Sequence, residues 1–221
     1  MRTLAPPLAR RPAAPVSAAP LDLPALLGPS AWRRLPEAVQ RRFSPGHAEA
    51  VYAGCIDLQC SRIGRVFAAL SRLLGSPLTP ACRTGVAATV RVHHDGRGGV
   101  VWERRFGPGG PGEATVRSTK ELGPDGGLFE RTDGDLGMAL SVFEHQGSLV
   151  FESRRYELAV GRRRIPVPAL LTPGICRVTH TDLGEGRFRF TMEMTHPLWG
   201  RTFHQAGVFA DPAPTTHLEL A

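Results

Sequence analysis

The chain has 221 residues, of which 42% are hydrophobic and 21% are charged, which is ordinary for a globular protein and sufficient for one domain with a substantial core. No stretch is apolar for long enough to span a membrane as a helix, and prolines interrupt the N-terminus where a signal peptide requires an apolar run. The composition therefore predicts a cytoplasmic protein. The 27 basic residues outnumber the 20 acidic ones, and the excess lies in residues 1 to 94, which carry 12 basic and 4 acidic residues.

Clustered cations are the electrostatic signature of proteins that bind nucleic acid or an anionic membrane. Here the arginines occur in small groups, such as Arg10 with Arg11 and Arg33 with Arg34, without interleaved aromatic or lysine residues. This pattern is more typical of a solvated helix face and a flexible tail. Nucleic acid is therefore not the expected partner.

The sequence indicates neither a metal site nor a cofactor. The glycine-rich segment 107–112 is followed by neither a GK[ST] motif nor a helix start, and no dinucleotide fingerprint is present. The cysteines lack the paired spacing of zinc or redox motifs. We therefore expect reduced, structural thiols at Cys55, Cys60, Cys82 and Cys176.

The first 29 residues are rich in Pro, Ala and Arg and have no apolar period, which predicts a flexible, disordered leader. A single β-rich domain is expected over residues 30–210 and a C-terminal tail over residues 211–221. The domain should begin with a short helix, because in LPEAVQRRF the apolar residues Leu35, Val39 and Phe43 share one helical face.

A strand-like stretch from Gly46 to Cys60 precedes the clearest helix of the sequence. Ser61 is a good N-cap, the apolar residues of RIGRVFAALSRLL recur at i, i+3, i+4 and i+7, and Gly75 with Pro77 ends the helix. We expect its apolar stripe to pack on the domain. The helix would be a lid over a ligand-binding barrel or a plug in the end of a filled one.

After Gly85 the apolar residues alternate with period two, and short glycine-rich turns separate the runs, which requires antiparallel neighbours. A long meander closes or curls to avoid exposed edges. The predicted fold class is therefore mainly β, an antiparallel meander that forms a calycin-like barrel or a strongly curved sheet. Beyond the first strand, strands are expected at 86–92, 100–106, 114–122, 128–132, 136–144, 148–160, 175–183, 187–195 and 199–209.

Six blocks between Leu35 and Val208 resemble a bacterial family of uncharacterised domains: LPEAVQRRF, VYAGCIDLQCSRIGRVFAALSRLLGSPL, WERRFG, LFERTDGDLGMALSV, SRRYELAVGRRRIPVPALLTP and GRFRFTMEMTHPLWGRTFHQAG. Members of that family occur alone or fused behind saccharopine-dehydrogenase-like reductases. The resemblance implies a reductase as a partner. It implies no established activity and no catalytic residues.

The pattern W-x-R-x-F occurs twice, in WERRF and WGRTF, and on a regular strand its arginine shares a face with two aromatic rings. In a barrel interior such an arginine needs an anionic partner, which a ligand carboxylate or phosphate could supply. On the outer face it would stack on the rings with its tip in water.

Two further features complete the candidate ligand-binding residues. In SRRYEL, Arg154 and Tyr156 share one strand face, with the same two interpretations. His196 falls on an apolar strand face, where the ordinary interpretation is a histidine whose hydrogen bonds are satisfied near a strand end. The candidate ligand-binding residues are Trp102, Arg104, Phe106, Arg154, Tyr156, His196, Trp199, Arg201 and Phe203.

Catalytic arrangements are weaker. Cys176 and His180 share a strand face, but the strand rise separates them by ~13 Å, too far for activation of a nucleophile. His180 and Asp182 are ~7 Å apart by the same rise, which permits an orienting contact.

Three functional hypotheses follow from these residues. The first is a non-catalytic domain that binds a hydrophobic or amphipathic anionic small molecule in its cavity, with Arg104 and Arg201 near the head group. The second is a small cavity enzyme, an isomerase, cyclase or hydrolase, with His180, Asp182, Glu130 or His196 as acid or base. The third is an interaction module for a reductase.

Overall fold

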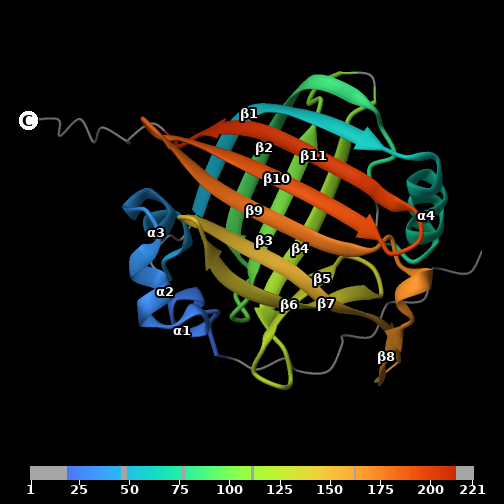
Figure 1. The fold of residues 1–221 in the computed structure, drawn as a ribbon, viewed down its shortest axis with the longest axis horizontal. Coiled ribbons are helices and arrows are strands. Elements are labelled where there is room, and N and C mark those ends of the chain that lie inside the picture. The colour runs from blue at the N-terminus through green and yellow to red at the C-terminus, as the bar shows by residue number, and fades with distance from the viewer. Residues whose placement is uncertain (1–18, 46–48, 76–77, 111, 162, 213–221) are drawn as a thin grey trace, which may run out of the picture.

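The computed structural model describes residues 19–45, 49–75, 78–110, 112–161 and 163–212. Its strands form one antiparallel sheet in the order β6-β5-β4-β3-β2-β1-β11-β10-β9-β7-β8. β6 also pairs with β7, which closes ten strands into a barrel and leaves β8 outside the ring. In Figure 1 the strands β9, β10 and β11 cross in front of β3 and β4. The predicted antiparallel meander is therefore confirmed, and of the two expected forms, barrel or strongly curved sheet, the structure has the barrel.

The described strands are β1 (Glu49–Cys60), β2 (Arg83–His94), β3 (Val100–Phe106), β4 (Ala114–Leu122), β5 (Leu128–Thr132), β6 (Leu136–His145), β7 (Ser148–Val160), β8 (Arg163–Val167), β9 (Ile175–Gly184), β10 (Arg187–His196) and β11 (Gly200–Ala210). The helices are α1 (Leu23–Leu27), α2 (Pro29–Arg34), α3 (Glu37–Phe43), α4 (Arg62–Leu73) and the 3-10 turn η1 (Ala169–Leu171). The helix after the first strand and the short helix over LPEAVQRRF are confirmed. α1, β8 and η1 were not predicted from the sequence. No helix of the described residues is both long and apolar enough to cross a membrane.

Residues of both expected tails belong to the packed domain. Leu21 and Leu23 are buried in the core, so the prediction of a flexible leader is wrong for residues 21 to 29, which include α1. Asp211 forms ion pairs with Arg41 and Arg42 of α3, so the domain extends beyond residue 210. The expectations for residues 1–18 and 213–221 lie outside the described residues.

Helices lie at both ends of the barrel. Phe43 of α3 places its ring against Trp102, Phe151 and His180 in the interior. At the opposite end, α4 begins directly after β1. The N–H of Asp135, in the β5–β6 turn, donates a hydrogen bond to the carbonyl of Leu74, which follows the last residue of α4. α4 therefore lies across this end of the barrel, as Figure 1 shows from the side.

The face by which α4 packs differs from the predicted one. Gly64, Phe67, Ala68 and Ser71 are buried, whereas Leu70, from the middle of the expected packing stripe, is exposed. A Cβ at Gly64 would lie 2.3 Å from the Thr202 carbonyl oxygen, so the helix approaches β11 closely along its small residues. This approach turns the long aliphatic side chains of α4 away from the barrel.

Candidate functional site

Three charged side chains meet inside the barrel, on the adjacent strands β3, β4 and β5. Lys120 pairs with Glu130 in the β4–β5 register, and its Nζ lies 3.1 Å from Glu130 Oε2. Arg104 Nη2 lies 3.9 Å from Glu130 Oε1, and Arg104 Nη1 donates a 3.4 Å hydrogen bond to Ser118 Oγ. Two cationic side chains therefore face one carboxylate in this interior cluster.

Burial and charge oppose each other in the cluster. Burial acts to raise the pKa of Glu130, but the Lys120 and Arg104 cations and the Ser118 hydroxyl outweigh it, so the pKa of this carboxyl is lowered. Burial lowers the pKa of the Lys120 ammonium, and the Glu130 carboxylate opposes that shift. The ammonium also lies 5.2 Å from the ring centroid of Trp102 and 5.1 Å from that of Phe151, an arrangement that favours the cation. With Lys120 protonated, the cluster carries one more positive than negative charge.

Arg104 is the least satisfied of these groups. A guanidinium has five N–H donors, yet its one hydrogen bond in the described structure is the long one to Ser118. Its side chain is 14% exposed, and it borders two cavities of the interior. Unpaired donors are costly where water is largely excluded, and Arg104 therefore keeps unused capacity to donate hydrogen bonds.

The larger of these cavities has a volume of about 80 Å³, and the smaller one about 20 Å³. One water molecule needs roughly 10–15 Å³ of such a cavity. The larger cavity therefore has room for a small organic group, and the smaller one for about one water molecule. Polar side chains of Arg104, Ser118, Glu130, Thr132 and the exposed Arg117 line part of the larger cavity. Much of the remaining wall is apolar and is formed by Val116, Leu136, Met138, Val178, Met192 and Met194.

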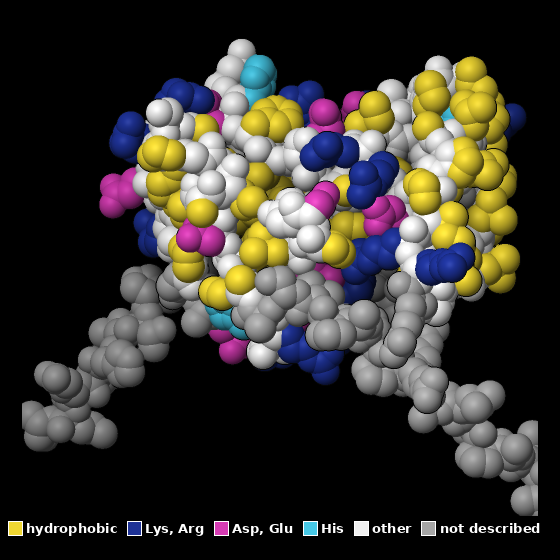
Figure 2. All heavy atoms as spheres, turned by 90° about the horizontal axis from the view of Figure 1, so that it is seen from below, with side chains coloured by type: hydrophobic (Ala, Val, Ile, Leu, Met, Phe, Trp, Pro, Cys, Tyr) yellow, Lys and Arg dark blue, Asp and Glu magenta, His cyan; other side chains and the backbone are white. Residues whose placement is uncertain are grey.

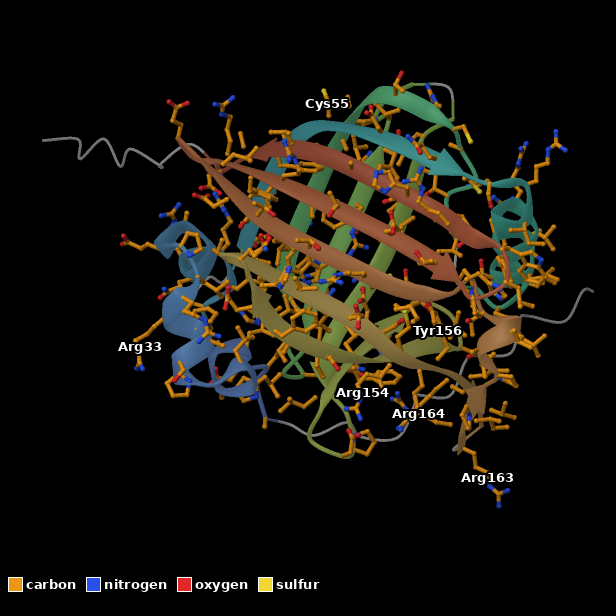
Figure 3. All side chains as sticks on the ribbon, viewed as in Figure 1. Arg33, Cys55, Arg154, Tyr156, Arg163 and Arg164 are labelled. Carbon is orange, nitrogen blue, oxygen red and sulfur yellow. The ribbon has the colours of Figure 1, made fainter. Side chains whose placement is uncertain are left out.

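An outer cleft of about 470 Å³ lies where β7 separates from β9. β7 pairs with β9 only from Leu149 to Glu152, and beyond this point it pairs with β8. Tyr156 lines both this cleft and the larger interior cavity, and its hydroxyl donates a 2.9 Å hydrogen bond to the Gly174 carbonyl. Tyr156 therefore forms part of the wall between the cleft and the interior. Figure 3 shows Tyr156 in the same region as Arg154 and Arg164 of β7 and β8.

The first W-x-R-x-F motif lies on the inner face of the barrel. Trp102 and Phe106 are buried in the core, and Arg104 stands between them in the cluster described above. The interpretation that placed this arginine on the outer face is wrong for this copy. The side-chain alternation of β3 is regular throughout its pairing with β2. For this reason Trp102, Arg104 and Phe106 share one strand face, as the sequence pattern predicted.

The second W-x-R-x-F motif is split by a β-bulge. Phe203 pairs with Met194 and Arg201 with Thr195, so Thr202 is the extra residue and the side-chain alternation shifts at this point. Phe203 is buried, whereas the Arg201 side chain is 54% exposed and lies 3.7 Å from Glu193 on the outer face. The predicted common face of Arg201 and Phe203, and the place of Arg201 near an interior head group, are therefore wrong.

A β-bulge in β7 likewise places the side chains of Arg154 and Tyr156 on different faces of the sheet. Leu140 pairs with Ser153 and Ala139 with Arg155, which leaves Arg154 as the bulged residue of β7. Tyr156 is buried and Arg154 is exposed, so the predicted shared face is wrong. Both residues nevertheless line the outer cleft.

His196 is buried at the end of β10, among groups from three segments. Its ring stacks on Trp199 at 4.2 Å and on Phe67 of α4 at 5.8 Å between centroids, and its Nδ1 accepts the Leu198 N–H. Its Nε2 lies 3.4 Å from the Leu170 carbonyl. These contacts fit the ordinary interpretation of a histidine satisfied near a strand end, and neither His196 nor Trp199 lines the interior cavities.

The remaining candidates for chemistry are not arranged for it. Burial raises the pKa of the Cys176 thiol to about 12, so the thiolate is not formed near neutral pH. Burial, with help from Lys120 and Arg104, lowers the pKa of His180 to about 3. Asp182 accepts a hydrogen bond from Arg42, and His180 Nδ1 has no hydrogen-bond partner among the described residues. An orienting contact between His180 and Asp182 is therefore absent from the described structure.

Sequence reasoning missed the roles of Lys120 and Ser118 in the cluster. Lys120 is the one lysine of the chain, which is a signal that its position has special requirements. Only the pairing of β4 with β3 and β5 shows that it faces Glu130 and Trp102. The described residues contain no group of histidine, cysteine or carboxylate side chains that could hold a metal ion.

Comparison with known proteins agrees with the resemblance in the sequence at the level of an uncharacterised domain. No curated protein matches this chain. A family described as a domain of unknown function, DUF4166, matches residues 35–209, which span the barrel from the start of α3 to the last residues of β11. The chain belongs to this family of domains of unknown function.

Proposed function

We propose that the barrel binds a small amphipathic anion, with its carboxylate or similar head group at Arg104 and its apolar part in the larger interior cavity. The observation that carries this proposal is the state of Arg104. A guanidinium that is only 14% exposed makes one long hydrogen bond and borders the larger cavity, in a cluster where cationic side chains outnumber carboxylates.

The cavity supports this class of ligand in polarity and in size. A head group at Arg104 would be within reach of a planar donor fork suited to carboxylates. The methionine, valine and leucine side chains of the opposite wall suit a short hydrocarbon chain or ring. A long-chain fatty acid would not fit a volume of about 80 Å³ without movement of these side chains.

Access from solvent would pass through the outer cleft beside β7. Tyr156 lines both the cleft and the cavity, and its hydroxyl donates a hydrogen bond across the gap between β7 and β9, to the Gly174 carbonyl. Arg154 lies at the cleft and forms no ion pair in the described part of the chain, so it would attract an anion toward the opening. The cleft, the tyrosine and the interior arginine thus form a path for one class of ligand.

The test is calorimetric titration of the full chain with straight-chain carboxylates of increasing length and with the corresponding alcohols. We expect binding to peak at a short or medium chain length and to require the carboxylate. Arg104→Met should weaken binding by roughly tenfold or more, because a charge-assisted hydrogen bond contributes about 1.5–3 kcal/mol. The melting temperature should stay unchanged or rise, because an unbalanced interior cation is removed.

The matched control is Arg105→Met, one residue further along β3. Arg105 lies on the outer face, 2.7 Å from Glu113, so its loss should leave carboxylate affinity unchanged. Equal affinity in the wild-type and Arg104→Met proteins, or equal affinity for alcohols and carboxylates, would contradict the proposal.

A further inference from the structure

The α4 end of the barrel exposes large apolar side chains from three segments of the chain. Val66, Leu70 and Leu73 follow the spacing i, i+4, i+7 along the outer side of α4, and Leu73 is 83% exposed. This is unusual for a helix whose neighbouring face is buried, because water-facing helix surfaces are normally polar. The end patch, as we name it, consists of Leu70, Leu73, Leu170, Leu171, Leu198 and Trp199, each of them about half exposed or more.

Contacts below the surface join the three segments of the end patch. The buried Phe67 of α4 lies 5.9 Å from Trp199 in the β10–β11 turn, between ring centroids. His196 stacks on both rings, and its Nε2 lies 3.4 Å from the carbonyl of Leu170 in η1. The exposed leucines therefore project from one rigid platform. Isolated exposed leucines are normal, but a contiguous group of them marks an interaction site.

The charged side chains on the segments that form the end patch are basic. Arg62, Arg65 and Arg72 are exposed on α4, and none of them forms an ion pair in the described structure. The segments 58–94, 158–181 and 194–210, which contribute α4, η1 and the β10–β11 turn, contain no aspartate or glutamate. Acidic side chains border the patch at the β5–β6 turn, next to Leu74.

The pictures show the same separation. In Figure 2 hydrophobic side chains gather on the side of the molecule where α4 and β8 lie in Figure 1, with basic side chains beside them. The acidic side chains in this view lie nearer the middle and toward the opposite side. Arg163, at the start of β8, extends away from the body of the protein in this region (Figure 3).

We infer that the end patch docks this protein onto a membrane surface that contains anionic lipids. An apolar helix stripe with arginines along its flanks, joined by an exposed tryptophan, is the arrangement by which helices lie in a lipid interface. The leucines and Trp199 would enter the boundary between head groups and acyl chains, and the arginines would contact lipid phosphates. The inference does not depend on the ligand proposed for the interior, because it rests on residues outside both cavities.

Co-sedimentation with vesicles tests the inference on the full chain. Vesicles of phosphatidylcholine alone are compared with vesicles that also contain phosphatidylglycerol. We expect sedimentation with the anionic vesicles, weaker binding to the neutral ones, and a loss of that preference at high salt, because salt screens the arginine contacts. The double substitution Leu70→Glu/Leu73→Glu should lower the apparent affinity at least roughly tenfold, since each change removes a leucine from the buried contact.

Two further variants separate the electrostatic contribution of the arginines from the apolar contribution of the end patch. Arg65→Gln/Arg72→Gln should lower the affinity for anionic vesicles several-fold and leave that for neutral vesicles unchanged. Val51→Glu is the matched control, because Val51 has the same 51% exposure as Leu70 but lies on β1 away from the end patch; it should sediment like the wild-type protein. Circular dichroism spectra and melting temperatures show that each variant is folded.

Three outcomes would overturn the inference. In the first, the wild-type protein stays in the supernatant with both kinds of vesicle. In the second, the leucine variant binds as tightly as the wild type. In the third, gel filtration shows a wild-type dimer that Leu70→Glu/Leu73→Glu converts to a monomer, which would assign the end patch to a second copy of this chain.

Discussion

Arg42 of α3 and Asp211 after β11, 169 positions apart in the sequence, form two hydrogen bonds of 2.6 and 2.9 Å between guanidinium and carboxylate. Arg42 also donates to Asp182 at 3.1 Å, and its side chain is 5% exposed. This buried pair joins the N-terminal helices to the ends of β9 and β11. Arg42 lies within the part of the chain that matches the family, and Asp211 lies two residues beyond it.

Replacement of Arg42 by methionine should therefore destabilise the protein by about 3–5 kcal/mol, because it removes the buried guanidinium that two largely shielded carboxylates share, and only Asp211 retains a second cation, Arg41. Arg41→Met is the control, since Arg41 contacts the same carboxylate from an exposed position and should cost about 0–1 kcal/mol. Urea unfolding of both variants measures the difference. Similar losses for the two would show that the Arg42 pair contributes little.

Substitutions on the buried and the exposed side of α4 should change the free energy of unfolding by very different amounts. Phe67→Ala should cost about 3–5 kcal/mol, because it removes a buried ring that contacts His196 and Trp199. Leu70→Ala should change the free energy of unfolding by about 0.5 kcal/mol or less, because the Leu70 side chain is half exposed. Urea titration measures both. A large loss for Leu70→Ala would mean that the predicted packing stripe is buried after all.

His180 should make the folded protein sensitive to mild acid. Its pKa is about 3 in the folded state against an ordinary value of 6.5, so below pH 6.5 the unfolded chain takes up a proton that the folded protein excludes. Stability should fall as the pH drops through this window, by up to about 1.4 kcal/mol per pH unit, and be unaffected by this group above it. His180→Phe should reduce the slope of stability between about pH 7 and pH 5, measured by urea unfolding. An unchanged slope for His180→Phe would contradict this role of His180.

The hydroxyl of Tyr156 should control how fast a ligand reaches the interior cavity, if the proposed function holds. Tyr156→Phe keeps the ring and removes the hydrogen bond to Gly174, at a cost of about 1 kcal/mol in stability. Association and dissociation of a bound carboxylate should both become faster, with little change in affinity, because the barrier is lowered while the bound contacts remain. Stopped-flow kinetics measure both rates. Unchanged rates would show that ligands reach Arg104 by another path.

Local pattern was sufficient for most of the fold. The alternation in β2, β3 and β10 identified these strands because one barrel face is buried and the other is wet. The short glycine-rich turns required antiparallel pairing, and Ser61 with the periodicity after it located α4. The ordinary role of His196 also follows from such a pattern. These features depend on residues close together in the sequence.

The parts that the sequence did not determine depend on residues that meet only in three dimensions. Bulges at Thr202 and Arg154 changed which side chains share a face, because one extra residue on a strand shifts the alternation beyond it. The face by which α4 packs was decided by the approach of Gly64 to the Thr202 carbonyl, which a helical projection cannot show.

The cluster of Arg104, Lys120 and Glu130 is likewise a product of strand register. The sequence determined that Arg104 would share a strand face with two aromatic residues. Closure of the barrel decided that this face points inward, and the pairing of β3, β4 and β5 placed one carboxylate between two cations. A shift of one residue in either pairing would have placed these charges on opposite faces of the sheet, because side chains alternate with period two.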